Sequence, residues 1–452
     1  MMLKLLFHNL IRSEEGSVLP LVGVAMFVLL GGTGLAVDVG RMELARSKLQ
    51  SSLDSAGLAV GAAVNSVNIN DEMKKYMEAN FDGQEINAKI IRQTVELTPD
   101  NKLVRVNATA ELPTTFMSLF GFDKVQIAAS SEVTREMKGM ELALVLDVTG
   151  SMAGQKLVDL KNASKDLINI VFGNQDTATN LWVGIVPFSQ TVNIGTSRSS
   201  WLASNSFNWG PTSWGGCVDA RYSSARDITD DPPASEKLPA YYWADNNDYN
   251  DWIRSNGQYN TPLNSTRGPN KYCPTAITTL TNQRQPLLTA VTALTAQGNT
   301  LINFGSVWGW RLLSPRWRGL WGGAMNTNNL PLNYNTDLMM KSIVIMTDGD
   351  NTMDNTADGA YGYLRDNRLG TTSQSTAESR LDTKLSNVCT AMKSKGILVY
   401  TVLFNNNNST TATLLRNCAS NPDYFFNTSD GIDLQKAFRK IGDSLANLRV
   451  SR

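Results

Sequence analysis

The sequence has very little histidine or cysteine. Its one histidine, His8, precedes the first apolar run, so His-based catalysis and His-ligated zinc are excluded from the folded part. Its four cysteines include no C-x-x-C pair, which argues against zinc and thiol-redox sites. The four cysteines can form two disulfides in three different ways. The local ones, Cys217–Cys273 and Cys389–Cys418, are expected if the domain is exported, and four buried thiols are the alternative.

The sequence also lacks an excess of either charge. Lys+Arg and Asp+Glu both number 41, so the formal net charge is zero and no bulk attraction to nucleic acid is expected. No G-x-S-x-G nucleophile motif occurs. The 452 residues allow two or three domains. A hydrophobic content of 42%, with plentiful Gly, Asn and Thr, favours a folded, extracytoplasmic protein.

The N-terminal part predicts a membrane anchor. Residues 1–17 form a short leader, expected to be cytoplasmic, and 18–37 is a run of 20 residues without a charge, long enough to cross a bilayer as a helix. A cleaved signal peptide and a buried core helix are the alternatives. The run is longer than the usual apolar core of a signal peptide and lacks a small-residue cut site. Positive charges are nearly balanced on its two sides, so the orientation rests on the cysteines, which favour an extracytoplasmic body.

An apolar stripe continues beyond the uncharged run. Its residues recur at three- and four-residue steps: Met42, Ala45, Leu49, Leu53, Ala56, Val60 and Ala63. This spacing predicts a helical continuation over 38–65. Residues 66–137 contain three stretches of alternating apolar and polar residues, together with a short helix over 113–121 that glycine ends. They predict a small α+β module without a chemical constellation.

From residue 138 onward, predicted strands alternate with predicted helices. This order predicts an α/β domain over 138–452, built on a doubly wound, mostly parallel sheet. Insertions interrupt the pattern at 196–275, 314–340 and 351–375. In such sheets ligands bind outside the carboxyl ends of the strands.

Side-chain oxygens gather where these predicted strands and helices begin or end. Two apolar strands, 141–147 and 341–347, run into acids, and a Gly-Asn turn precedes a predicted helix. The first strand supplies the candidate metal ligands Asp147, Thr149 and Ser151, the second ends on Asp348, and the turn presents Thr300. Carboxylate and hydroxyl oxygens suit Mg²⁺, Mn²⁺ or Ca²⁺. The alternative is structural, because Thr and Ser are also common helix caps.

This set resembles the metal-ion-dependent adhesion site of the von Willebrand factor A (vWA) domain. That site takes Asp-x-Ser/Thr-x-Ser from a first loop, Thr from a second and Asp from a third, which correspond here to Asp147-Val-Thr-Gly-Ser151, Thr300 and Asp348. The resemblance implies a Rossmann-like vWA fold and a divalent metal, with Mg²⁺ expected and Mn²⁺ or Ca²⁺ as alternatives. It also implies an acidic side chain of a ligand as the remaining metal partner, and no enzymatic activity.

The N-terminal segment resembles a second family. Arg12-Ser-Glu-Glu-Gly16, the apolar run and Ala36-Val-Asp38-Val-Gly40-Arg41 look like the TadG-like N-terminal segment of the Tad/Flp (tight adherence) pilus system, over 12–65. Prepilins of that system carry Glu five residues after the cleaved glycine, where this chain has Leu21. We therefore expect the anchor to remain uncleaved.

Together the two resemblances imply a single-pass bacterial membrane protein with an extracytoplasmic vWA body. It would support pilus assembly or adhesion, with other Tad/Flp pilus or envelope proteins as partners and no nucleic acid. One alternative is an envelope scaffold unrelated to pili. The other is a metal-dependent hydrolase, for which Asp350 or Asp354 would have to act as general base.

The predicted topology also separates the insertions. Strand 181–188 should run parallel to 141–147, and the turn after it should send the chain back. The 196–275 insertion is therefore expected to leave from the face opposite the ion, unless it folds back along the side of the domain. Only 351–375 begins directly at the Asp348 strand. It is therefore predicted to shape the choice of ligand.

Overall fold

The computed structural model describes residues 18–62, 69–83, 87–98, 103–134, 139–178, 180–246, 248–336 and 339–450. The chain forms two compact units that divide between Glu136 and Met137. The predicted leader 1–17 lies outside the described residues.

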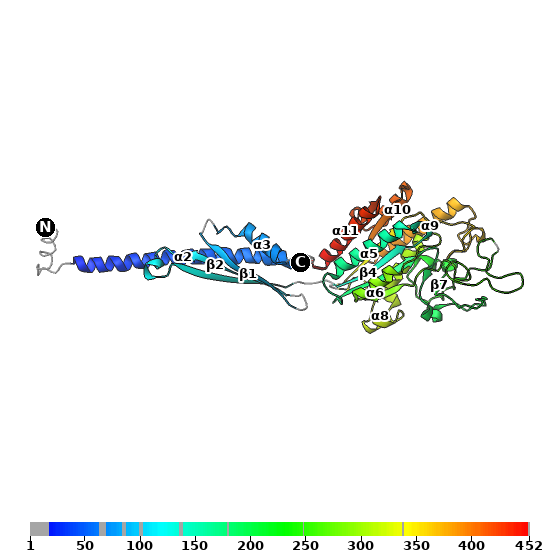
Figure 1. Ribbon diagram of the computed structural model, residues 1–452, viewed down its shortest axis with the longest axis horizontal. Helices are drawn as coiled ribbons and strands as arrows, with labels where there is room; N and C mark the ends of the chain where they lie inside the picture. Colours follow the sequence, from blue (N-terminus) through cyan, green and yellow to red (C-terminus); the bar gives the residue numbers. More distant parts are fainter. Residues whose placement is uncertain are drawn as a thin grey trace. The chain divides into compact units, whose positions relative to one another are not determined.

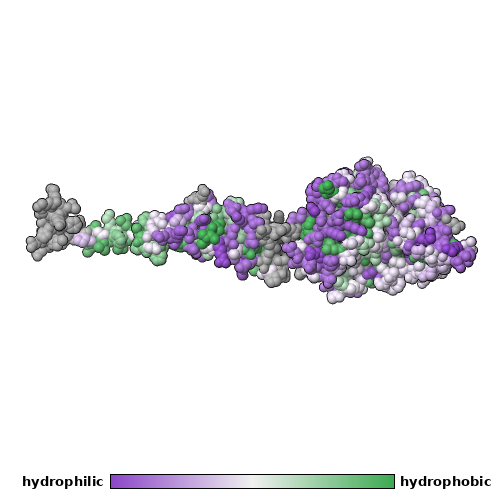
Figure 2. Space-filling model, viewed as in Figure 1, coloured by the Kyte–Doolittle hydropathy of each residue, from purple (hydrophilic) through white to green (hydrophobic). Residues whose placement is uncertain are grey.

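One long helix, α2 (Leu19–Ala62), dominates the first unit (Figure 1). Its first half exposes apolar side chains, which appear as hydrophobic surface in Figure 2, and its length and composition make it a candidate membrane span. In its second half the predicted stripe is buried, through Ala45, Leu49, Leu53, Ala56 and Val60. The uncharged run and the stripe therefore belong to one helix in two different surroundings.

The stripe packs on a small antiparallel sheet. Strands β1 (Lys89–Leu97), β2 (Leu103–Pro113) and β3 (Lys124–Thr134) pair in the order β1-β2-β3, and α3 (Ile69–Asn80) lies beside α2. Alternate residues of β2 from Val104 to Leu112 enter the core with the stripe of α2. The short helix predicted over 113–121 is present between β2 and β3 as the 3-10 helix η1 (Met117–Phe120), which ends at Gly121 with φ 87°.

The second unit is a mixed α/β fold with an eight-stranded sheet. On one side the parallel order is β11 (Phe425–Thr428), β10 (Leu398–Phe404), β9 (Met339–Thr347), β4 (Gly139–Asp147) and β5 (Leu181–Phe188). Next to β5 the pairing becomes antiparallel, with β6 (Val192–Asn193), β7 (Cys217–Val218) and β8 (Thr278–Thr281). The mostly parallel sheet is as predicted, whereas β7 and β8 were not predicted.

Alternate residues of the central strands enter two separate cores. Leu142, Leu144 and Leu146 of β4 pack with α5 (Gln155–Phe172), α6 (Arg284–Thr292) and α11 (Gly431–Val450). Ala143 and Val145 pack with α7 (Ile302–Leu313), α9 (Gln374–Ser394) and α10 (Ser409–Cys418). The central strands are buried on both faces, as expected for a parallel sheet covered by helices.

Two disulfides tie the second unit together. Cys217–Cys273 links β7 to the end of the 196–275 insertion, and Cys389–Cys418 joins α9 to α10. Together they form the local one of the three pairing schemes that four cysteines allow. The 314–340 insertion contains α8 (Gly323–Thr327) and packs Trp317 and Trp321 against Trp201 of the first insertion.

A buried ion pair joins the two central strands. Glu141 of β4 lies directly opposite Lys341 of β9, and their side chains bond each other. Burial raises the pKa of Glu141 and lowers the pKa of Lys341, while their attraction opposes both shifts. Glu141 Oε1 also accepts from Leu332 N at 2.7 Å, and Lys341 Nζ donates to Leu313 O at 2.9 Å. All polar atoms of the pair therefore have partners close to the sheet.

We predict that Lys341→Met lowers the unfolding free energy of the second unit by about 3 to 5 kcal/mol, because it leaves the Glu141 carboxylate buried without its counter-charge. The control is Lys436→Met, whose solvent-exposed pair with Asp433 should contribute little to stability. Urea unfolding of the full chain in detergent, followed by tryptophan fluorescence, measures both, because all ten tryptophans lie between Trp182 and Trp321. Equal effects of the two substitutions would contradict the role of the pair.

Candidate metal centre

Two adjacent parallel strands end at the same edge of the sheet. The register of β4 and β9 places Leu146 opposite Met346, so Asp147 ends β4 next to Asp348, which follows β9. From β4 the chain continues to β5 on one side, and it later returns to β9 on the other side. In parallel sheets a crevice for ligands opens where connections diverge in this way.

The loop after β4 brings hydroxyls to Asp348. Thr149 Oγ1 and Ser151 Oγ lie 2.9 Å apart, and Ser151 Oγ donates to Asp348 Oδ1 at 2.6 Å. The 3-10 helix η2 (Gly150–Met152) carries Ser151. Thr149 and Asp348 are buried, whereas Ser151 is exposed. The cluster therefore opens to solvent at Ser151.

Thr300 reaches the cluster from a separate loop. Its carbonyl accepts from Thr352 N at 2.9 Å, which ties this loop to the segment after Asp348. A β-carbon placed on Gly349 would lie 3.5 Å from Thr300 Oγ1 and 3.9 Å from Ser151 Oγ, so both hydroxyls border Gly349. In the part of the chain that the structure describes, Thr300 Oγ1 has no hydrogen-bond partner. The structure thus gathers all five predicted residues at one edge of the sheet.

The two carboxylates of the cluster differ in their partners. Asp147 accepts from Thr149 N at 2.8 Å and from Thr347 Oγ1 at 2.6 Å. Burial, and then the charge of Asp348, raise the pKa of Asp147 to about 7, against the effect of these hydrogen bonds. Asp348 pairs with Lys156, whose Nζ lies 2.7 Å from Asp348 Oδ2 and is partly exposed. Two buried acids therefore lie close together, which favours a cation at this edge.

The donor set determines which metals fit. Among the described residues, no group of three or more His, Cys, Asp or Glu side chains could hold a metal ion. The cluster instead combines two carboxylates with three hydroxyls, which are hard oxygen donors of the kind that Mg²⁺, Mn²⁺ and Ca²⁺ prefer. The unpartnered hydroxyl of Thr300 and the closeness of Asp147 to Asp348 both fit an ion of this class.

The acids considered as general bases have structural roles. Asp350 accepts from Asn408 Nδ2 at 2.6 Å and from the Thr411 hydroxyl, and thereby holds the start of α10. Asp354 accepts from Thr356 N at 2.7 Å within its own turn. These hydrogen bonds give both carboxylates a role in shaping their own loops.

Gln190 was not predicted as a site residue, yet it joins three segments there. It is buried directly after β5, where its Nε2 donates to Tyr241 OH at 3.0 Å and to Asp358 O at 2.7 Å. Its Oε1 accepts from Asn299 N at 3.1 Å, beside Thr300. A polar side chain at the carboxyl end of a parallel strand is the same signal that identified Asp147, and it could have identified Gln190.

The 196–275 insertion folds back to the metal edge, a course that its predicted departure from the opposite face left open. Ser189 Oγ, directly after β5, donates to Tyr272 O at 3.1 Å, so the end of this insertion returns to the site. The insertion folds back because its disulfide and its contacts with Gln190 hold it there. The 351–375 insertion also borders the site, since Asn299 Nδ2 donates to Asp354 Oδ2 at 3.0 Å.

Comparison with known proteins adds one family match. Residues 16–64 match the family model described as "Putative Flp pilus-assembly TadE/G-like", which agrees with the resemblance expected for 12–65. No curated protein sequence matches the chain.

Three solved structures resemble parts of the chain. The vWF domain of the type V pili tip protein Mfa5 from Porphyromonas gingivalis is 11% identical, the match covers 70% of this chain and 97% of that one, and the TM-score is 0.37. The pilus adhesin SpaC from Lactobacillus rhamnosus GG is 11% identical over 82% of this chain and 36% of that one, with a TM-score of 0.38. The mussel byssus proximal thread matrix protein 1 with a zinc-occupied MIDAS motif is 11% identical over 70% of this chain and 47% of that one, with a TM-score of 0.33. This chain spans less than half the length of the latter two. At these TM-scores the three structures support no conclusion about its function.

We predict that Gln190→Ala lowers the unfolding free energy by about 2 to 4 kcal/mol, because one buried and two partly buried hydrogen bonds are lost. Gln285→Ala, on the exposed face of α6, is the control and should change it by less than about 0.5 kcal/mol. Urea unfolding followed by tryptophan fluorescence gives both values. Limited proteolysis should show faster cleavage around Asn299 in the Gln190 variant alone. Unchanged stability and cleavage would mean that Gln190 does not join these segments.

Proposed function

We propose that the chain is a membrane-anchored, non-enzymatic vWA protein of the Tad/Flp pilus system. It binds a protein or surface ligand through a divalent metal ion, and this binding supports pilus assembly or adhesion. The ion would be held by Asp147, Thr149, Ser151, Thr300 and Asp348, with Mg²⁺ expected. When bound, it would offer a position for an acidic side chain of the ligand.

The observation that carries the proposal is the convergence of these five residues from three loops that lie far apart in the sequence. Ser151 Oγ donates to Asp348 Oδ1, although the two residues lie 197 positions apart in the sequence. The two hydroxyls that border Gly349, those of Ser151 and Thr300, come from different loops. A helix cap, which is the structural alternative for Thr149 and Ser151, needs only local contacts. Thr149, the N-cap residue of η2, makes no side-chain cap hydrogen bond, and the N-cap of α5 is Gly154, so neither Thr149 nor Ser151 caps that helix.

Two observations support the membrane and pilus parts of the proposal. The family model covers residues 16–64, within which α2 exposes an uncharged apolar surface long enough for a bilayer. The disulfides Cys217–Cys273 and Cys389–Cys418 favour an extracytoplasmic body, because such bonds persist in oxidising compartments.

The hydrolase alternative is the weaker one, because Asp350 and Asp354 are held in loop-forming hydrogen bonds. The scaffold alternative differs from the proposal only in its partners. Counting Flp pili on cells that lack the chain, complemented with the natural form or with Asp147→Ala, separates the two. If cells that lack the chain carry a normal number of pili, the proposal is wrong and the envelope-scaffold alternative remains.

We predict that Asp147→Ala or Asp348→Ala abolishes Mg²⁺ or Mn²⁺ binding by the folded chain, because each removes a carboxylate ligand. Thr300→Ala should weaken binding less, since a neutral hydroxyl attracts a divalent cation less strongly. Isothermal titration calorimetry of the full chain in detergent measures the affinity. Asp423→Ala, an exposed acid in η8 (Pro422–Tyr424), is the matched control and should bind normally.

A substitution that should strengthen metal binding is a second test, because an unfolded variant could not bind the ion more tightly. Lys156→Met removes the ammonium that pairs with Asp348. Since a partly exposed pair contributes up to about 1 kcal/mol, binding of Mg²⁺ should tighten by up to about fivefold. Unchanged affinity in both aspartate variants would remove the assignment of the site.

We also predict that peptide mapping under non-reducing conditions, on protein isolated from its native envelope, recovers Cys217–Cys273 and Cys389–Cys418. An exported body should keep both bonds oxidised. Four free thiols, or a Cys217–Cys389 link, would contradict the extracytoplasmic placement.

A further inference from the structure

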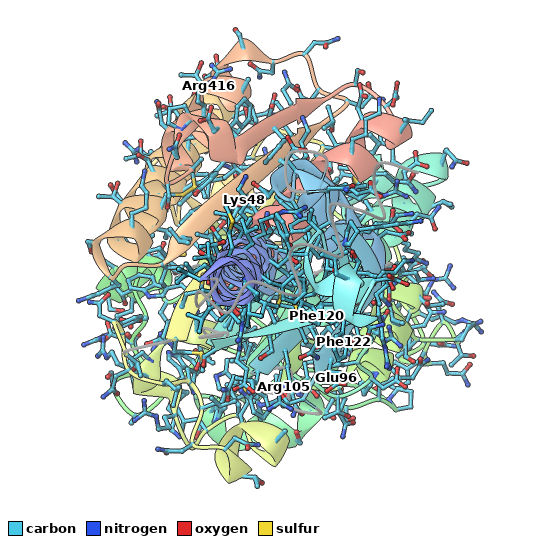
Figure 3. All side chains as sticks on the ribbon, turned by 90° about the vertical axis from the view of Figure 1, so that its left-hand side faces the viewer. Lys48, Glu96, Arg105, Phe120, Phe122 and Arg416 are labelled. Carbon is cyan, nitrogen blue, oxygen red and sulfur yellow. A yellow bond between two sulfur atoms is a disulfide. The ribbon has the colours of Figure 1, made fainter. Side chains whose placement is uncertain are left out.

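The connection between β2 and β3 exposes an unusual amount of apolar surface. Four large side chains within seven residues are exposed: Phe116 at 38%, Leu119 at 80%, Phe120 at 54% and Phe122 at 59%. Figure 3 shows Phe120 and Phe122 together on one side of the end-on helix α2. Connections between strands normally carry polar, Gly or Pro residues at their tips, and exposed apolar patches mark interaction sites.

A buried carboxylate holds this connection against α2. Asp38, 2% exposed, accepts hydrogen bonds from the backbone N–H groups of Thr115 at 3.0 Å, Phe116 at 2.7 Å and Met117 at 2.7 Å. Arg41, one turn further along α2, donates to Thr115 Oγ1 at 2.8 Å. Asp38, a residue of α2, thus caps the first turn of η1. Its hydrogen bonds hold that turn beside position 38 of α2.

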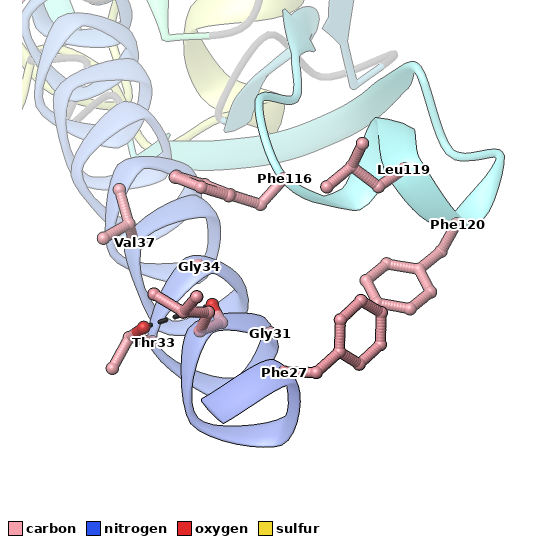
Figure 4. Close-up of a pocket in the computed structure, with 9 residues that line it drawn as sticks. Phe27, Gly31, Thr33, Gly34, Val37, Phe116, Leu119 and Phe120 are labelled. Carbon is pink, nitrogen blue, oxygen red and sulfur yellow. Dashed lines mark hydrogen bonds between the residues drawn. The ribbon is translucent and has the colours of Figure 1, made fainter. Parts of the chain in front are cut away.

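The tethered turn and α2 enclose an apolar groove of ≈ 620 Å³. In Figure 4, the ring of Phe120 faces that of Phe27, and Phe116 lies against the helix at Gly34. A β-carbon on Gly34 would lie 2.6 Å from the Phe116 ring, so only glycine permits this approach. Thr33, the one hydroxyl residue in the groove, donates to Leu29 O and Leu30 O of its own helix.

The groove lies alongside the uncharged part of α2. Phe27 is seven residues, about 10 Å, closer to the N-terminus than Gly34. Charged residues resume at the same level on both elements, with Asp38 and Arg41 on the helix and Asp123 following Phe122 in the connection. The apolar tip and the apolar run therefore end together.

The backbone of the connection suits an apolar solvent. Besides the three N–H groups bound by Asp38, Thr114 N donates to Asp123 O, Leu119 N to Phe116 O, Gly121 N to Ser118 O and Phe122 N to Met117 O. The hydroxyls of Thr114 and Ser118 also donate to carbonyls of the connection. A segment that enters hydrocarbon must satisfy its donors internally, because lipid offers no partner.

We propose that the Phe116–Phe122 connection is a second membrane contact, a wedge inserted among the lipid acyl chains beside α2. The inference rests on the proposed membrane anchor. Lipid is the occupant that the structure favours, since the patch is continuous with the apolar surface of α2 and seven backbone N–H groups of Thr114–Phe122 are bonded internally. The wedge seats the first unit at the bilayer surface and limits rotation of α2 about its axis.

Three matched leucines test the wedge. Leu29, Leu58 and Leu119 are each replaced by Cys in the full chain, spin-labelled, and reconstituted into phosphatidylethanolamine–phosphatidylglycerol vesicles. Leu29, in the uncharged run, and Leu58, in the sheet-bound part of α2, are 67% and 65% exposed. All four natural cysteines are in disulfides, so the introduced thiol is the one that reacts. Collisions with O₂ report lipid, and collisions with a water-soluble nickel complex report water.

The expected result is that labels at positions 29 and 119 collide mainly with O₂, while the label at 58 collides mainly with nickel. If position 29 is in lipid and position 119 is in water, the wedge is wrong and the anchor stands. If position 29 is itself in water, the anchor is wrong and the wedge with it. A label at 119 that is shielded from both reagents would assign the patch to contact between copies of the chain and overturn the wedge.

Two further variants test how the wedge is held. Asp38→Ala should raise the nickel collision rate of the label at 119 at least threefold and leave that at 29 unchanged. Should this variant misfold, Gly34→Ala displaces the Phe116 ring alone and should act in the same direction. Gly31→Ala is its control, since a β-carbon there meets nothing within 4 Å. If the collision rates at position 119 are unchanged in Asp38→Ala and Gly34→Ala, the contacts of Asp38 and Gly34 do not hold the wedge in place.

Discussion

The register between β4 and β9 is the constraint on which the candidate metal centre depends. Glu141 and Lys341 are direct cross-strand partners within this buried sheet, and the same pairing brings Asp147, six residues after Glu141, and Asp348, seven after Lys341, to one edge. A slip of β9 by one residue would turn Lys341 to the other face of the sheet and leave Glu141 buried without its counter-charge, at a cost of several kcal/mol. The ion pair therefore specifies the geometry of a site that it does not touch. Such a role explains why a sheet of otherwise apolar strands retains two charges at its centre.

The loops at this edge are ordered by contacts with one another more than by their own sequences. Gln190 joins the end of β5 to the Thr300 loop and to both long insertions, and Asp354 holds Asn299 from the other side. Ser151 and Asp348 are already bonded to each other. For the proposed ion, these residues would exchange existing hydrogen bonds for metal coordination without first ordering a loose loop, which keeps the entropic cost of binding low.

The sequence predicts the regular elements well and the insertions poorly. The apolar runs of β4 and β9 and the stripe of α2 repeat a simple pattern, so their positions follow from periodicity. The strands β7 and β8, with two and four residues, are too short to show any period. Asp147, Thr149 and Ser151 could be chosen because polar residues that follow a parallel strand lie at one edge, whereas the full set with Thr300 and Asp348 came from the resemblance to the vWA site. The return of 196–275 could not be predicted, because it depends on contacts such as Ser189 with Tyr272, 83 residues apart.

Asp38 shows the same limit in the first unit. In the sequence it marks the end of an uncharged run, whereas in the structure it is a buried cap for a turn 77 to 79 residues away. Periodicity cannot reveal such a partner, but burial explains the choice of residue. A carboxylate accepts several N–H groups at once and remains charged while doing so, which a neutral side chain cannot match. A single acid at the boundary of α2 therefore both ends the apolar surface and fixes the element beside it, so that one helix serves two surroundings without a break.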